Sequence, residues 1–383
     1  MYVAGVGAIS AIGNNVAECI ASFKKEESGI GDITSLNTIH KNILPVAEVK
    51  LSNAQLAKIS GLSVEKSRTA LLSMIAAKEA LDDAAIPGLK ALRTGFISAN
   101  SVGGMDKTEG FFEEFFHNPA KGKLRNIVHH ECGSVTELVA DQLGIKDYVT
   151  TISTACSSSA NSIFFASRLI QNNILDVAVA GGTDALTKFT LNGFNTLMIL
   201  DKEFCKPFDE NRKGLNLGEG AGYVVLVSQR VADMLAKKPY CTLSGYCNAN
   251  DAYHQTASSP DGIGSFLAMS GALKKSGLQT TDISYINLHG TGTQNNDIAE
   301  GTAIARLFQK DFPKISSTKS FTGHTLGACG GLEAVFSAIA IQQGYIYPGL
   351  RITTPMKDLP FTTEKHFSEN QAVNHVLSNS FGF

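Results

Sequence analysis

The chain has 383 residues, of which 43% are hydrophobic, 18% are charged and 36 are glycine. Such a chain can bury a large core, and it is neither a coiled coil nor a disordered tail. The net charge of −2, from 33 basic and 35 acidic residues, makes a dedicated nucleic-acid binder an unfavoured class. At about 150 residues per domain, the length allows two or three units or two fused α/β halves.

Short apolar runs alternate with helical patterns along the chain. We predict strands at 3–6, 94–99, 148–153, 176–180, 222–227 and 285–288. Apolar residues recur at helical spacing and predict helices at 70–85, 161–171, 264–276 and 299–308. Strands separated by helices of this length are typical of βαβ units and of mixed or parallel sheets.

The start of the chain, Met1 to Val6, runs directly into the first strand, without a basic segment or a cleavage site. No apolar run reaches about 18 residues, so we expect no membrane insertion and a cytoplasmic protein. The odd number of cysteines and the absence of a CxxC pair predict neither a disulfide framework nor a zinc site. They are Cys19, Cys132, Cys156, Cys205, Cys241, Cys247 and Cys329.

Glycine patterns indicate backbone packing and not a nucleotide site. Gly5 and Gly7 suggest a dinucleotide fingerprint, but its third glycine would stand where Ser10 is. The phosphate-binding pattern GxxxxGK[ST] does not occur in the chain either. We interpret Gly5 and Gly7 as part of a tight turn after the first predicted strand. Close backbone packing around a buried centre is predicted for the clusters at 181–182, 218–222 and 327–331.

Cys156 stands out among the thiols because it lies between a predicted strand and a predicted helix. Thr154, Ala155 and Ser157 beside it are small, so a substrate can approach closely. N–H groups at a helix N-terminus stabilise a thiolate. The pattern predicts a nucleophile at this position.

Two histidines occupy positions at which a strand end delivers a side chain to a site. His289 ends a predicted strand and precedes Gly-Thr-Gly-Thr, and His324 closes the run Lys-Ser-Phe-Thr-Gly-His. The remaining histidines considered are interpreted as structural or surface residues: His40, His117, His129, His130, His366 and His375.

Four segments taken together resemble the β-ketoacyl-acyl-carrier-protein synthases of the elongating, Cys-His-His type, and the resemblance covers the whole chain. The segments are 154–159, 217–222, 289–293 and 319–333. The Lys-Ser-x-Thr-Gly-His run separates this chain from the initiating synthases, which resemble a Cys-His-Asn pattern. It also separates it from thiolases, which use a second cysteine late in the chain.

The resemblance implies an α/β, thiolase-like five-layered α-β-α-β-α fold from two duplicated halves. Residues 1–235 would form the N-terminal half with the nucleophile Cys156, and residues 236–383 the C-terminal half with His289 and His324. A homodimer, or a heterodimer with a second ketosynthase-like subunit, is also implied, with the nucleophile near the interface.

The implied reaction is the decarboxylative condensation of an acyl chain on Cys156 with malonyl-acyl-carrier protein. It lengthens a fatty-acid or polyketide/aryl-polyene chain by two carbons. His289 and His324 would stabilise an oxyanion, with Lys319 and Glu333 supporting them. The resemblance implies no cofactor and no metal, because the substrates are carried on the phosphopantetheine of the carrier protein.

By the same resemblance, Thr291 and Thr293 would hold the phosphopantetheine arm. Val102 would line the acyl pocket, with Phe194 as a further substrate-binding residue. Phe383 would act as a gate, in a segment that continues in the family with more glycines. An acidic carrier protein needs a basic docking surface, for which we expect Lys121, Lys123 and Arg125, with Lys66 and Arg68 as a second cluster.

Three alternatives stay open. A non-catalytic or partner-dependent chain-length subunit would resemble a synthase, but a non-catalytic one loses the nucleophile, whereas Cys156 is present. An active synthase could serve a polyketide or aryl-polyene pathway instead of fatty-acid synthesis, and the triple serine at 157–159 leans that way. The third alternative is a thiolase-like enzyme acting on coenzyme A esters.

Overall fold

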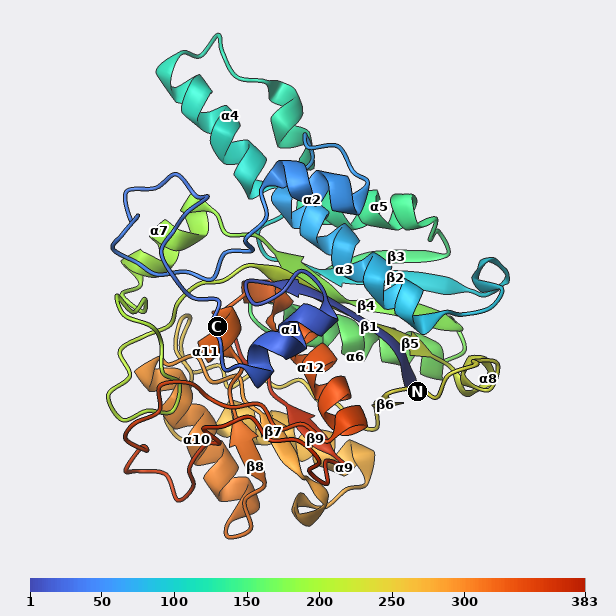
Figure 1. The fold of residues 1–383 in the computed structure, drawn as a ribbon, viewed down its shortest axis with the longest axis vertical. Coiled ribbons are helices and arrows are strands. Elements are labelled where there is room, and N and C mark those ends of the chain that lie inside the picture. Colours follow the sequence, from blue (N-terminus) through green and yellow to red (C-terminus); the bar gives the residue numbers. More distant parts are fainter. Residues whose placement is uncertain (383) are drawn as a thin grey trace.

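The computed structural model describes residues 1–382 (Figure 1). The strands are β1 (Tyr2–Ser10), β2 (Thr94–Ala99), β3 (Tyr148–Ile152), β4 (Val177–Asp184), β5 (Gly220–Val227), β6 (Cys241–Thr242), β7 (Tyr285–Asn287), β8 (Lys314–Ser316) and β9 (Val376–Ser378). The helices are α1 (Val16–Lys24), α2 (Asn53–Ser60), α3 (Arg68–Ala84), α4 (Met105–His117), α5 (Cys132–Leu143), α6 (Ser158–Gln171), α7 (Lys188–Thr196), α8 (Gln229–Ala232), α9 (Ile263–Ser276), α10 (Gln294–Phe308), α11 (Lys319–Thr322) and α12 (Cys329–Gln343).

The larger sheet has the strand order β3-β2-β4-β5-β1-β6. β2 runs parallel to β3 and β4, whereas β5 is antiparallel to both β4 and β1. The central strands are buried on both faces, which explains their nearly continuous apolar sequences. One face packs against α3 and α5, and the other packs against α6 and α12.

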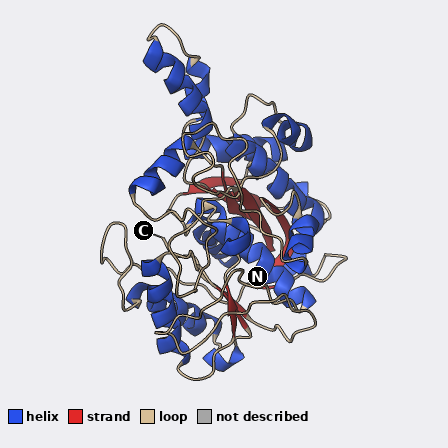
Figure 2. Ribbon diagram, turned by 60° about the vertical axis from the view of Figure 1, so that its left-hand side comes forward, coloured by secondary structure: helices blue, strands red, loops and turns tan. Residues whose placement is uncertain are grey.

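The smaller sheet has the order β8-β7-β9, with all three strands parallel. Its outer face is covered by α9 and α10. α12 contacts both sheets and so lies between them, and α6 packs beside it on the larger sheet. The predicted five-layered α-β-α-β-α arrangement is confirmed, and the two sheets, both visible in Figure 2, are unequal in size.

The predicted strands and helices are all present, and two glycine interpretations were wrong. Gly5 and Gly7 lie inside β1, where a side chain would collide with the backbone of α3: an added Cβ would lie 2.2 Å from Ala80 O and 2.1 Å from Ala76 O, respectively. The strand at 176–180 does not stop at its glycines, since β4 continues to Asp184. In both cases the glycines let a neighbouring element approach closely, without a turn.

The three glycine clusters do pack closely around a buried centre, as predicted. A Cβ on Gly222 of β5 would lie 2.3 Å from the backbone nitrogen of Leu332 in α12. A Cβ on Gly331 would lie 2.3 Å from Gly222 O, and one on Gly181 would lie 2.0 Å from the same atom. α12 therefore sits directly on the larger sheet, and this brings the segment before it close to β4.

α4 and the 3₁₀ segment η2 (Leu124–His129) form an arm, residues 105–129, that projects from the body of the molecule (Figure 1). None of the residues of α4 is buried. Phe112 is 59% exposed and Phe116 is 73% exposed, and Leu124 and Val128 are also exposed. Such an apolar surface on a helix is typical of an interface with another molecule.

β6, which follows the predicted boundary near residue 235, still belongs to the larger sheet and pairs with β1. The chain reaches the smaller sheet at β7. The division into halves at 235 stays a prediction. Within residues 1–382, no helix combines the length and the apolar character needed to cross a membrane.

Candidate active site

Cys156 lies in a tight turn between β3 and α6, two residues before the helix begins, and is 5% exposed. The Ser158 hydroxyl closes the turn, because it accepts from Thr154 N at 2.7 Å and donates to Ala155 O at 2.6 Å. Ala155 has a φ of +52°, a left-handed conformation that costs energy for a residue with a Cβ. The strained turn sets the thiol at the N-terminus of α6.

His289 follows the end of β7, and a buried carboxylate holds its backbone. Glu300 of α10 accepts from His289 N at 2.9 Å and from Gly290 N at 2.8 Å. Burial raises the pKa of Glu300 to about 7. Asp297, one turn earlier on α10, accepts from Thr291 N at 3.1 Å and therefore fixes the next part of the loop.

His324 lies between α11 and the short 3₁₀ turn η4 (Leu326–Ala328). The N–H of Leu326 donates to His324 Nδ1 at 3.0 Å, which orients the ring. Leu326 has a φ of +52°, so this donor comes from a strained backbone position. The thiol of Cys329 lies 3.5 Å from the same Nδ1, and burial raises its pKa to about 11.

The structure brings the three residues predicted for catalysis together. One donor atom from each of Cys156, His289 and His324 lies within 4.8 Å of the others, and all three residues are buried. The imidazole centroids are 5.4 Å apart and the rings are nearly perpendicular, at 88°. Two ring nitrogens can therefore face one small space beside the thiol.

Lys319 and Glu333 form a buried ion pair next to this cluster. Lys319 Nζ lies 3.3 Å from Nδ1 of His289. Burial opposes the charge on Lys319, but the Glu333 carboxylate outweighs it and raises the pKa of the ammonium group. Burial, followed by the charge of Lys319, holds the pKa of His289 well below its usual range, so the ring is neutral.

The two imidazoles share one tautomer. Nδ1 of His289 faces the Lys319 ammonium, and Nδ1 of His324 accepts from Leu326 N. In a neutral imidazole the proton must then sit on Nε2, which makes both Nε2–H groups hydrogen-bond donors. Cys156, His289 and His324 also lie close enough together to ligate a metal ion. A protonated Nε2, however, has no lone pair with which to bind one. The arrangement suits the stabilisation of an oxyanion.

Thr291 and Thr293 lie in the loop after His289, with their hydroxyl oxygens 2.9 Å apart. Thr291 is buried and Thr293 is half-buried. Because α10 fixes this loop through Asp297, the two hydroxyls are held near the catalytic cluster. Their predicted contact with a phosphopantetheine arm stays a prediction.

Val102 and Phe194 belong to one apolar cluster, and Phe194 lies near His324. Val102 is buried in an apolar cluster that also contains Leu191, Leu326 and the half-buried Phe194 of α7. The ring centroid of Phe194 is 6.3 Å from that of His324. Their predicted contact with an acyl chain stays a prediction.

Phe383, the predicted gate, lies outside the described residues. The segment before it passes the cluster: the ring centroid of Phe381 is 6.1 Å from that of His289. A Cβ added to Gly382 would lie 3.0 Å from Cys156 N. The backbone at residue 382 therefore contacts the turn that carries the thiol.

Along η2, which leads back to the body, the arm brings part of the first predicted basic cluster beside Lys66 of the second. Lys121, Lys123 and Arg125 are exposed, and Arg125 pairs with Glu65 at 3.2 Å. Lys66 Nζ lies 3.5 Å from Nε2 of His129. Burial and then the nearby charges of Lys66 and Lys107 lower the pKa of His129.

The prediction that Arg68 belongs to this surface was wrong. Arg68 is 8% exposed and forms an ion pair with Glu219 at 2.6 Å. Its guanidinium also donates to Val49 O at 2.9 Å and to Leu51 O at 3.0 Å. With its donors used inside the protein, Arg68 holds the 49–53 segment onto α3 and cannot meet a docking partner.

Sequence reasoning missed the carboxylates that hold the loops, Asp184, Asp297 and Glu300. Asp184 ends β4 and is fully buried. The signal for it was an acidic residue at the end of an otherwise apolar strand, in the run Val-Ala-Val-Ala-Gly-Gly-Thr-Asp. The two on α10 had no signal of this kind, because acidic residues on a helix are usually exposed.

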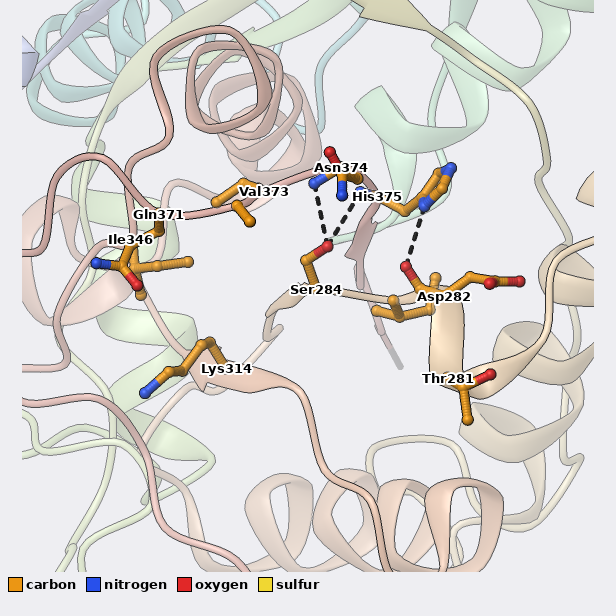
Figure 3. A pocket seen from close by; sticks show the side chains of 11 residues that line it. Thr281, Asp282, Ser284, Lys314, Ile346, Gln371, Val373, Asn374 and His375 are labelled. Atoms are coloured by element: carbon orange, nitrogen blue, oxygen red, sulfur yellow. Dashed lines mark hydrogen bonds between the residues drawn. The ribbon is translucent and has the colours of Figure 1, made fainter.

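A separate surface pocket of about 490 Å³ lies at the opposite end of the smaller sheet (Figure 3). Ser284 and Lys314, at the starts of β7 and β8, line it, whereas His289 follows the end of β7. Lys314 pairs with Glu364 at 3.0 Å. The pocket therefore has no part in the cluster around Cys156.

Comparison with protein families and curated sequences identifies relatives along the whole chain. Residues 1–232 match the model "Beta-ketoacyl synthase, N-terminal domain", and residues 240–353 match "Beta-ketoacyl synthase, C-terminal domain". A 3-oxoacyl-[acyl-carrier-protein] synthase 2 of Staphylococcus aureus (strain N315) is 32% identical over 397 residues, covering 100% of this chain and 95% of the relative. The similarly named protein of Rhizobium meliloti (strain 1021) is 37% identical over 306 residues, 76% of this chain and 72% of the relative.

Solved structures show the same similarity. A chain from the structure titled "The ishigamide ketosynthase/chain length factor" matches with a TM-score of 0.92 and 27% identity, covering 100% of this chain and 96% of that chain. A chain from a ketosynthase in complex with its chain length factor from Xenorhabdus doucetiae matches with a TM-score of 0.84 and 27% identity, covering 100% and 94%.

Proposed function

Because this chain belongs to the β-ketoacyl synthase family, we propose that it condenses an acyl thioester with malonyl-acyl-carrier protein. The reaction releases CO2 and lengthens the acyl chain by two carbons. The observation that carries the proposal is the buried cluster of Cys156, His289 and His324, with its donor atoms within 4.8 Å. A thiol and two imidazole N–H donors are the groups that this chemistry requires.

The first step is acyl transfer to Cys156. A thiolate is both a good nucleophile and a good leaving group, so it can accept an acyl group and later release it. The thiolate attacks the thioester carbonyl of the acyl-carrier protein, and the phosphopantetheine thiolate leaves and takes up a proton. In this proposal the backbone N–H of Cys156 donates to the oxyanion of this step.

The second step is decarboxylation of the malonyl thioester. The bond to the carboxylate breaks, CO2 leaves, and the electron pair becomes an enolate with negative charge on the thioester oxygen. The Nε2–H groups of His289 and His324 stabilise that oxygen, and removal of one such donor typically costs about 10²–10³ in rate. Because both rings are buried, water does not compete for these hydrogen bonds.

The third step forms the carbon–carbon bond. The enolate carbon attacks the acyl carbonyl on Cys156, and the Cys156 thiolate leaves as the carbonyl reforms. Lys319 and Glu333 act through His289, because they keep it neutral and fix its tautomer. Thr291 and Thr293 hold the phosphopantetheine arm, and Val102 and Phe194 line the space for the acyl chain. The substrates arrive on a carrier protein, so the protein itself needs no further cofactor.

We also propose that the enzyme works as a dimer. The arm at 105–129 exposes Phe112 and Phe116, and β3 leaves one edge of the larger sheet open. Unpaired edges and apolar surface together favour pairing with a second subunit. The partner is a second copy or a ketosynthase-like subunit, and the similarity to chains from ketosynthase–chain length factor structures supports the second option.

The carrier protein docks on the basic side chains of the arm. Lys121 and Lys123 are exposed there, close to Arg125 and the half-buried Lys66. A basic surface attracts an acidic carrier protein and speeds encounter. We place the enzyme in the cytoplasm, a proposal supported by seven cysteines that are all unpaired.

A chain-length subunit that needs a partner is the second candidate. The retained Cys156 and histidines favour an active subunit, whereas the two 27% identical structures favour a heterodimer with a chain length factor. Both readings share the chemistry of Cys156. They differ in whether the isolated chain accepts an acyl group.

Intact-protein mass spectrometry after incubation with a panel of acyl-carrier proteins tests the proposal. We expect a gain of one acyl group in the wild type and in Cys247→Ser, which removes an exposed thiol, but none in Cys156→Ala. The chain length that is preferred separates a fatty-acid supply from a polyene supply. Acylation that persists in Cys156→Ala would refute the mechanism, and acylation only with a second subunit would establish the partner-dependent reading.

A further inference from the structure

The side chain of Asp184 connects two loops that border the proposed active site. It is completely buried at the end of β4. Its carboxylate accepts from Ser101 N at 2.9 Å and from Val102 N at 3.1 Å, in the loop that carries the proposed acyl-pocket residue. Its other oxygen accepts from Gly327 N at 2.7 Å, in the turn after His324.

The hydrogen bond from Gly327 to Asp184 lies next to the backbone N–H that orients His324. Leu326, which precedes Gly327, donates its N–H to His324 Nδ1 at 3.0 Å and holds a φ of +52°. A strained conformation of this kind persists only where the surroundings enforce it. The hydrogen bond from Gly327 N to Asp184 is one of those constraints, because the two donors belong to consecutive peptide groups.

The surroundings of Asp184 are shaped for a carboxylate. A Cβ added to Gly327 would lie 2.7 Å from Asp184 Oδ2, so a side chain at that position would displace the acceptor. The side chains of Val102 and Leu326 pack in the same apolar cluster, on the two loops that Asp184 joins. One carboxylate therefore fixes the pocket wall and the histidine turn relative to each other.

We propose that Asp184 is a positioning residue that holds the strained turn at Leu326, and with it the Nε2–H tautomer of His324, in register with the Val102 wall of the acyl pocket. The inference rests on the proposed function, because it assigns a role within the same reaction. Asp184 does not touch the reacting atoms. It acts through the backbone N–H groups that it accepts.

An amide cannot replace this carboxylate. Asp184 accepts N–H groups with both oxygens, whereas an asparagine would present NH2 to one of these donors. Two facing donors repel, and one buried N–H loses its partner. The turn at 326–327 or the loop at 101–102 must then move, and a shift of about 1 Å near the reacting groups can cost about 10²-fold in rate.

The test compares Asp184→Asn with wild type and with Glu79→Gln. Glu79 is a matched control, because it also accepts backbone N–H groups, from Ala8 and Val16, but lies on α3 away from the site. Burial raises the pKa of Asp184 to about 7, so the measurements are made at about pH 8.5, where the carboxylate is ionised. The readouts are malonyl decarboxylation, the acyl chains accepted by Cys156, and the 15N NMR signals of the histidines.

In Asp184→Asn we expect kcat for malonyl decarboxylation to fall by about tenfold to about a hundredfold, with KM changed by less than about twofold. The unprotonated Nδ1 signal of His324, identified by its loss in His324→Asn, should weaken or shift. The acyl-chain profile should broaden, because the Val102 wall is released. Glu79→Gln should match wild type in all three readouts.

The NMR signal reports the tautomer without any substrate, so it separates this inference from the proposed reaction. Wild-type kcat and an unchanged Nδ1 signal in Asp184→Asn would overturn the inference. A loss of activity that only follows the folded fraction, with the signal unchanged, would also overturn it. If Asp184→Asn does not fold, Gly327→Ala applies the same test by pushing the carboxylate away. If neither variant folds, Asp184 is a folding determinant and the positioning role is wrong.

Discussion

Lys319 Nζ lies 3.3 Å from Nδ1 of His289 and is paired on its other side with Glu333. The ammonium group therefore keeps a neutral ring neutral and directs its remaining proton to Nε2. The two histidines reach the same tautomer through different partners, since the partner of His324 Nδ1 is the backbone N–H of Leu326. One donor depends on a charge and the other depends on a strained turn.

Replacing Lys319 with Met should raise the pKa of His289. The positive charge of Lys319 lowers that pKa together with burial, so its removal shifts the pKa upward, towards the ordinary value of about 6.5. Histidine NMR titration would measure the shift, and decarboxylation should become pH-dependent in the same range. The double variant Lys319→Met with Glu333→Gln controls for the unpaired carboxylate. An unchanged titration would contradict the assigned role of Lys319.

Removing one imidazole should separate the two halves of the reaction. In His289→Ala we expect malonyl decarboxylation to fall by about 10²–10³, because one oxyanion donor is lost. Acyl transfer to Cys156 should change much less, since a backbone N–H serves that step. Stopped-flow measurement of CO2 release and mass spectrometry of Cys156 would follow the two steps. Equal losses in both would show that His289 also serves acyl transfer.

A larger residue at Val102 should shorten the acyl chains that are accepted. Val102 is buried in the cluster beside His324, so the ring in Val102→Phe would fill the proposed pocket. We expect acylation with long chains to fall by about tenfold or more, with short chains affected little. Val102→Ala is the matched change in the other direction. Equal acceptance of long chains by Val102→Phe would place the pocket elsewhere.

Reversing one charge on the arm should weaken carrier-protein use. In Lys123→Glu we expect kcat/KM for carrier-bound substrates to fall several-fold at low salt, mainly through slower encounter. A small pantetheine thioester should be used as well as before. Lys146→Glu, a reversal of an exposed charge near the start of β3, provides the control. If both reversals act alike, the effect is one of net charge and docking lies elsewhere.

The exposed rings of the arm should be needed for the dimer. Burying one phenylalanine side chain removes about 150–250 Å² of its surface from water. Replacing both Phe112 and Phe116 with serine should therefore weaken association by on the order of 5 kcal/mol. Sedimentation velocity would measure the resulting shift to monomer. Leu267→Ser, an exposed apolar residue on α9, is the control. A dimer that survives the double change would show that the open edge of β3 suffices.

The sequence predicted the elements whose apolar pattern is local. The strand at 94–99 has the same bounds as β2, because every residue in it is buried and the run is short and apolar. The helix α4 was not predicted. None of its residues is buried, so its phenylalanines belong to no apolar core that would have indicated a helix of the body.

The candidate site, too, could be predicted only where the signal is local in the sequence. The residues Cys156, His289 and His324 could be predicted because each stands in a recognisable run. The acidic residue at the end of an apolar strand marks Asp184 as unusual, but its role could not be predicted, because the N–H groups that donate to it belong to loops far away in the sequence. Arg68 was wrongly assigned to a surface for the same reason: its partner Glu219 lies on β5, and only the fold brings the two together.

The contact between Gly382 and the Cys156 turn has a consequence for biosynthesis. Cys156 leaves the ribosome long before the segments that carry His289, His324 and residue 382. Domains generally fold in the order in which they are made, so the thiol turn can form early. The histidines and the C-terminal segment that surround the thiol cannot be in place at that stage. An incomplete chain therefore holds an isolated thiol but not a synthase, and condensation can begin only after the C-terminal segment has docked beside the nucleophile.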